Sequence, residues 1–178
     1  MPKPVRQEQI AYAVHITLAC TIVIASLAVS PGRSGVFGGA LGLLMVAIAV
    51  IDKNSFIIPD RLTLAAFLLG LAQAASEGFG PILENIAVAT LRGIVLALAF
   101  YILREIYYRL RHRQGIGLGD VKLAAVAGAW LDGTLISTAI EIAALAALTS
   151  YTASQLVAKR PLNAAAKLPF GLFFAPAI

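Results

Sequence analysis

The chain has 178 residues, of which 60% are apolar and 13% are charged. A soluble domain carries about twice that charged fraction, so the composition excludes an ordinary soluble protein and indicates a membrane protein. The single cysteine, Cys20, excludes an internal disulfide bond and a cysteine-cluster zinc site.

Six apolar stretches that can cross a bilayer follow one another along the chain. We expect these spans at residues 9–30, 36–51, 62 to about 76, 82 to about 103, 120–131 and 134–157. The fourth helix is expected to continue to Tyr107 and Tyr108, because aromatic residues are common at the membrane interface.

The apolar tail from Leu168 is shorter than these six stretches. Ten helical residues, from Pro169 to Ile178, cover about 15 Å, or half a bilayer. The tail is therefore re-entrant or an incomplete span, and we favour the incomplete span because no terminating signal follows. The sequence thus predicts an all-α, polytopic membrane helical bundle with six spans and a partial C-terminal segment, forming one membrane-embedded domain over residues 1–178.

The basic residues set the orientation of this bundle. With the N-terminus in the cytoplasm, every Lys and Arg except Arg33 and Arg92 falls in a cytoplasmic segment, a bias that strongly favours this orientation. The net charge of +5 follows the same topology, so we expect contact with membrane lipid and no nucleic-acid partner. Asp52, where a helix leaves the bilayer, and Asp120, where a helix enters it, both lie at the cytoplasmic face.

Two aspartates that meet at one membrane face can hydrolyse a peptide bond. In a partly desolvated site they share one proton, so that one carboxylate accepts a proton from water while the other carboxyl polarises a carbonyl. Neither His15 nor His112 stands in a metal-binding spacing, so no metal or cofactor is expected. The alternative is that Asp52 and Asp120 are simply solvated at the membrane interface.

Three stretches resemble motifs of the type IV prepilin peptidases and occur in the order of that family. Residues 52–63, DKNSFIIPDRLT, resemble the first motif, in which an aspartate ends a helix and an Ile-Pro-Asn/Asp turn follows. Residues 115–123, GIGLGDVKL, resemble the second motif, G-x-G-D-x-K-L. Residues 167–171, KLPFG, are similar to a late Pro-Phe-Gly, although Leu172 stands where the family often has proline.

The resemblance implies an intramembrane aspartic endopeptidase of the cytoplasmic (inner) membrane, with Asp52 and Asp120 as its catalytic pair. The substrates it implies are prepilin or pseudopilin precursors, whose basic leader is removed, usually after glycine. Larger family members also methylate the new N-terminus and carry paired cysteines, so methyltransferase activity is not expected here. The residues that support the two motifs are Pro59, Gly117, Gly119 and Lys122.

Two other functions stay open on the residues alone. A small transporter or proton-conducting protein would use buried carboxylates as a relay, and Arg92 and Glu141, both within spans, favour it. We expect these two residues to pair, because an unpaired charge inside a bilayer costs about 2.5–3.5 kcal/mol. A non-catalytic assembly factor is disfavoured, because both aspartates are present.

Two expectations concern the cytoplasmic face. Residues 105–119 are polar, basic at first and glycine-rich at the end, so we expect a mobile loop that admits the substrate. Asp52 ends a helix and Asp120 begins one. The helix dipoles therefore predict that Asp52 carries the shared proton and that Asp120 is ionised.

Overall fold

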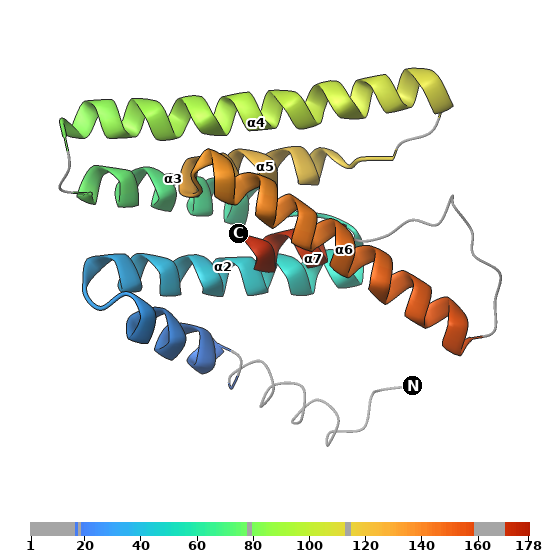
Figure 1. Ribbon diagram of the computed structural model, residues 1–178, viewed down its shortest axis with the longest axis horizontal. Helices are drawn as coiled ribbons and strands as arrows, with labels where there is room; N and C mark the ends of the chain where they lie inside the picture. Colours follow the sequence, from blue (N-terminus) through green and yellow to red (C-terminus); the bar gives the residue numbers. More distant parts are fainter. Residues whose placement is uncertain (1–16, 18, 78–79, 113–114, 159–169) are drawn as a thin grey trace.

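The computed structural model describes residues 17, 19–77, 80–112, 115–158 and 170–178, and within these ranges all regular structure is helical (Figure 1). A short apolar helix, Ala19–Val29, comes first. The labelled helices that follow are α2 (Arg33–Ser55), α3 (Asp60–Ser76), α4 (Ile82–Arg111), α5 (Leu118–Trp130), α6 (Gly133–Val157) and α7 (Phe170–Ala177). The all-α prediction is therefore confirmed for the part of the chain that the structure describes.

Three of the described helices, α2, α4 and α6, are long and apolar enough to cross a membrane. Helix α3 has 17 residues and α5 has 13, so α5 covers only about 20 Å. Most of the expected first span, with His15, lies outside the described residues. The membrane character is supported, and the count of six spans stays a prediction.

Two helices extend further than the sequence predicts. Helix α2 continues through Asp52 to Ser55, because the Ser55 hydroxyl donates to the Ile51 carbonyl and Phe56, at φ 54°, closes the helix with a left-handed cap. Helix α4 includes Tyr107 and Tyr108, as expected, and runs on to Arg111.

The expected loop over residues 105–119 is therefore wrong for its first half. Residues 105–111 form the last two turns of α4, where Arg109 donates to Glu105 at 2.8 Å, the favourable i, i+4 spacing. His112, at φ 49°, ends the helix with a left-handed cap, and its N–H donates to the Tyr108 carbonyl.

Helix α5 lies at the centre of the bundle, in contact with α3, α4, α6 and α7 (Figure 1). Helix α7 lies between α2 and α6 and also contacts α5. This position explains how a helix of 13 residues can be stable, because most of its surface is covered by neighbours. Its buried residues are Leu123, Ala124, Val126, Ala127, Gly128 and Ala129.

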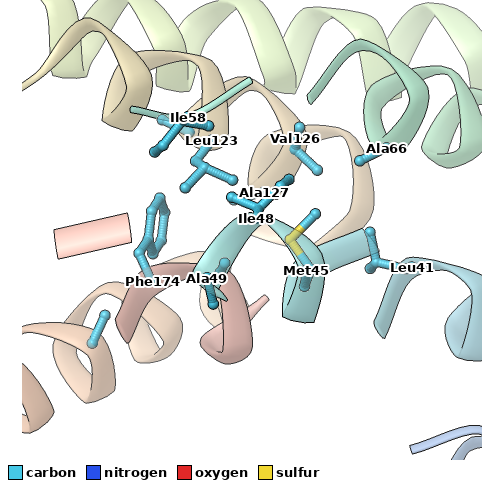
Figure 2. Close-up of a cluster of buried hydrophobic side chains, with 13 residues drawn as sticks. Leu41, Met45, Ile48, Ala49, Ile58, Ala66, Leu123, Val126, Ala127 and Phe174 are labelled. Carbon is cyan, nitrogen blue, oxygen red and sulfur yellow. The ribbon is translucent and has the colours of Figure 1, made fainter. Parts of the chain in front are cut away.

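The core joins α2, α5 and α7 with the short connection that follows α2. Ile48 from α2, Leu123 and Val126 from α5, and Phe174 from α7 are almost fully buried. Figure 2 shows these side chains converging, with Ile58 from the α2–α3 connection beside Leu123. The core therefore lies directly behind the helix ends that carry Asp52 and Asp120.

Small residues let α4 and α5 approach backbone to backbone. A Cβ placed on Gly128 would lie 2.5 Å from the Arg92 carbonyl oxygen, and one on Gly93 would lie 2.9 Å from the Ala125 carbonyl oxygen. Such close approach is typical of membrane helices, where van der Waals packing replaces the hydrophobic drive between them.

We predict that Gly128→Ala destabilises the protein. The added methyl group meets a backbone carbonyl that cannot rotate away, so overpacking of about 1–3 kcal/mol exceeds the helix-propensity gain of alanine. Thermal unfolding in detergent measures the effect. Gly133→Ala is the matched control, because nothing lies within 4 Å of its Cβ position. Equal midpoints for the two variants would contradict the prediction.

Candidate functional site

Three aspartates lie at one end of the bundle. Asp52 is in the last turn of α2, Asp60 is the first residue of α3, and Asp120 is the third residue of α5. Only four residues, 56–59, connect α2 to α3, so the end of α2 and the beginning of α3 lie at the same end of the bundle. This end is on the right in Figure 1, where α5 also begins. Pro59 directly precedes α3, where its fixed φ of −69° suits the start of a helix.

Asp52 is buried, with 5% of its surface exposed. Its Oδ2 accepts a hydrogen bond of 2.9 Å from the backbone N–H of Leu172, the third residue of α7. The first N–H groups of a helix have no partner within the helix, so this one is free to bind the carboxyl. The Asp52 carbonyl accepts the N–H of Phe56 at 2.8 Å, which fixes the backbone as well.

Asp120 is held by its own helix. Its Oδ2 accepts a hydrogen bond of 3.0 Å from the backbone N–H of Gly117, the residue just before α5. This N–H has no partner within the helix, and a side chain in the first turn commonly supplies one. Gly117 and Asp120 therefore act together to fix the position of this half-buried carboxyl. The second motif thus has a direct structural meaning, since its glycine supplies the donor and its aspartate the acceptor.

The surroundings of the two carboxyl groups share one side chain, Ile58, which lies beside Gly119 next to Asp120 and beside Gly171 next to Asp52. The two helices meet through side chains in the core, and at the end that carries the aspartates the Ile58 side chain lies against both α5 and α7. A Cβ on Gly119 would lie 2.9 Å from the Ile58 side chain, and a Cβ on Gly171 would lie 2.7 Å from Ile58 Cδ1 and 2.8 Å from Asp52 Oδ2. Both glycines are therefore needed for α5 and α7 to close around Ile58.

Lys122 pairs with Asp60 across the site. The sequence placed Asp60 in the Ile-Pro-Asn/Asp turn and Lys122 in the second motif, with no contact expected between them. The pair joins the beginning of α3 to the beginning of α5, although 77% of the Asp60 side chain is exposed. Exposed ion pairs contribute about 0–1 kcal/mol, so this pair orients the two helices more than it stabilises them.

The expected pair of Arg92 with Glu141 is wrong. The Arg92 guanidinium donates to Asp132, in the turn between α5 and α6, and α4 does not contact α6. Glu141 makes no ion pair within the part of the chain that the structure describes. A position within a span gave the wrong partner, because it does not say which helices are neighbours.

Sequence reasoning missed three contributors to the site: Ile58, Gly171 and the N–H of Leu172. The first two belong to the quoted Ile-Pro and Pro-Phe-Gly stretches, so their spacing was a signal, but their packing partners were not visible. Among the described residues, no group of three His, Cys, Asp or Glu side chains is placed to hold a metal ion.

The comparisons with known proteins agree with this site. The Type IV leader peptidase family matches residues 39–152, more than half of the chain, and the match includes both Asp52 and Asp120. The chain therefore belongs to the type IV leader peptidase family. The expected resemblance is thus confirmed, and so is the expectation of an enzyme of this family.

Similar curated proteins carry one name, prepilin leader peptidase/N-methyltransferase. The one from Escherichia coli (strain K12) is 29% identical over 165 residues, which cover 89% of this chain and 71% of that protein. The one from Burkholderia pseudomallei (strain 1026b) is 32% identical over 164 residues, which cover 86% of this chain and 50% of that protein. The one from Aeromonas salmonicida (strain A449) is 26% identical, and the chain spans 54% of its length. No solved structure matches the chain significantly.

We predict that Gly171→Ala destabilises the protein and that Ile58→Val relieves part of the loss. The new methyl group would press on Ile58 Cδ1, an atom that valine lacks. Overpacking of this kind costs about 1–3 kcal/mol. A double-mutant cycle on thermal unfolding in detergent measures the coupling. The matched control is Gly119→Ala, whose methyl group would also meet Ile58 Cβ, so Ile58→Val should relieve it less. Additive effects at positions 58 and 171 would show that the two residues do not touch.

Proposed function

We propose that the chain is an intramembrane aspartic endopeptidase that removes the basic leader from prepilin or pseudopilin precursors, usually by a cut after glycine. One observation carries the proposal: Asp52 and Asp120 lie at the same end of the bundle, each held by a backbone N–H. Family membership and the name of the curated relatives support the substrate class. We extend the proposal to one peptidase domain over residues 1–178.

The proposed mechanism needs only the two carboxyl groups and water. One carboxylate takes a proton from a water molecule, whose oxygen attacks the carbonyl carbon of the scissile peptide bond. The protonated carboxyl of the pair donates a hydrogen bond to the carbonyl oxygen, where negative charge develops. The proton taken from water then passes to the leaving nitrogen as the C–N bond breaks. Burial favours this arrangement, because two adjacent negative charges are costly out of water.

We propose that the site lies at the cytoplasmic face of the inner membrane, with the N-terminus in the cytoplasm. The basic residues at the end of the bundle that carries the site support this orientation. The described ones are Lys53, Arg61, Arg104, Arg109, Arg111 and Lys122. A leader with basic residues would remain in the cytoplasm or on lipid phosphates while the cleavage position enters the site.

The case for a proton-conducting protein is weaker in the structure than in the sequence. That hypothesis relied on Arg92 and Glu141 as charged partners inside the bilayer. Arg92 instead pairs with Asp132 in an exposed turn, at the opposite end of α5 from Asp120. We therefore retain the peptidase alone.

We predict that Asp52→Asn and Asp120→Asn each lower leader cleavage at least about a hundredfold, because each removes one partner of the acid–base pair. The assay follows cleavage of a synthetic peptide with a basic leader and a glycine at the cut, using protein purified in detergent. Asp60→Asn is the matched control, since Asp60 lies at the same end but faces Lys122. It should stay within about threefold of the unaltered protein.

Two results would contradict the dyad. Full activity in Asp52→Asn or in Asp120→Asn would remove that residue from the chemistry. A loss in Asp60→Asn as large as in the other two would place Asp60 within the catalytic pair. Thermal unfolding of each variant separates lost chemistry from lost folding.

A further inference from the structure

We propose that the backbone N–H of Leu172 is a positioning group of the site, which holds the Asp52 carboxyl in its working orientation. The inference rests on the proposed function, since it assigns α7 a part in the reaction of Asp52 and Asp120. It makes the short C-terminal helix a component of the active site and not only a packing element.

The first argument is the hydrogen bond itself. Asp52 is 5% exposed, and within the described residues its side chain accepts a hydrogen bond only from the Leu172 N–H, at 2.9 Å. A buried carboxyl that loses such a donor is left with an uncompensated desolvation penalty and free rotation. The contact binds Oδ2 and leaves Oδ1 for the water molecule or the partner carboxyl.

The second argument is that packing fixes the donor. Phe174, one turn after Gly171, is fully buried and stacks on Phe100 of α4, with ring centroids 5.7 Å apart and an interplanar angle of 8°. It also lies against Phe170, at a centroid distance of 5.4 Å. Gly171 brings the α7 backbone against Asp52, because any Cβ there would lie 2.8 Å from Oδ2. The N–H therefore cannot drift from the carboxyl without disturbing the core.

The third argument is the position of Leu172 in its helix. It is the third residue of α7, so its N–H has no acceptor within the helix and is free for Asp52. A proline at this position would remove the donor and keep the helix, because proline is tolerated in the first turn. Gly171 before it has no Cβ to clash with the proline ring. The Cδ of a proline at 172 would take the place of the N–H hydrogen and press on Asp52 Oδ2, so an ester at this bond, which adds no carbon there, is the cleaner test of the donor alone.

The experiment compares Leu172→Pro with Leu172→Ala in the leader-cleavage assay. Leu172→Pro should lower kcat about tenfold or more, equivalent to about 1.4 kcal/mol, and leave KM unchanged, because the substrate still binds. Leu172→Ala keeps the N–H and measures the effect of losing the side chain alone, so Leu172→Pro should have a kcat at least about tenfold lower than Leu172→Ala. Equal kcat values for the two variants would overturn the inference, and so would a change confined to KM.

A second variant tests the proposal if Leu172→Pro fails to fold. Replacing Leu172 by its α-hydroxy analogue puts an ester in place of the amide, which removes the N–H and keeps the side chain. Its kcat should also fall about tenfold. Infrared spectra, with the Asp52 band assigned by its absence in Asp52→Asn, should show a shifted carboxyl band in the ester variant. An unchanged band would show that no hydrogen bond exists and would overturn the inference.

The two readouts keep the two proposals distinguishable. If the unaltered protein cleaves no leader peptide, the proposed function is wrong, and the positioning role in catalysis is wrong with it, whatever the infrared spectra show. If the unaltered protein cleaves and the ester variant cleaves equally well, the proposed function stands and only the role of Leu172 is overturned.

Discussion

A carboxyl group that leaves water must be given hydrogen-bond donors, and this requirement organises the structure around Asp52. The side chain is 5% exposed, and its donor comes from α7, more than a hundred residues later in the chain. For that donor to arrive, α7 must lie within the bundle, and Gly171 must face the carboxyl with no side chain. The stacked rings of Phe100 and Phe174 then hold α7 in place.

Close packing of small residues lets α5 lie at the centre of the bundle. Membrane helices gain little from excluding lipid, so they associate where glycine and alanine let their backbones meet. Helix α5 shows this clearly: Gly128 fits against the Arg92 carbonyl, while Trp130 donates to the Ala66 carbonyl at 2.9 Å. Because α5 packs against neighbouring helices along its length, the carboxyl of Asp120 at its beginning is fixed relative to α3 and α7.

The sequence was informative wherever a pattern runs along one element. Hydropathy located the helices, and the distribution of basic residues placed Asp52 and Asp120 at one end. The sequence failed where a contact depends on which elements are neighbours. The partner of Arg92 is Asp132, in a turn, and Lys122 faces Asp60, neither of which follows from spacing along a helix. A backbone donor such as the Leu172 N–H cannot be predicted from a pattern of side chains.

The helix dipoles around Asp52 and Asp120 are more alike than the positions of the two residues in α2 and α5 suggest. Asp52 is in the last turn of α2, where the helix dipole disfavours an anion, and Asp120 is in the first turn of α5, where the dipole favours one. This asymmetry alone would leave the proton on Asp52. The first turn of α7 opposes it, because its free N–H groups bring partial positive charge to the Asp52 carboxyl. Each aspartate thus faces the beginning of a helix, α7 for Asp52 and α5 for Asp120. Both carboxyl groups thus accept a backbone N–H at the beginning of a helix, so the helix dipoles oppose each other at Asp52, and the assignment of the shared proton to Asp52 stays a prediction.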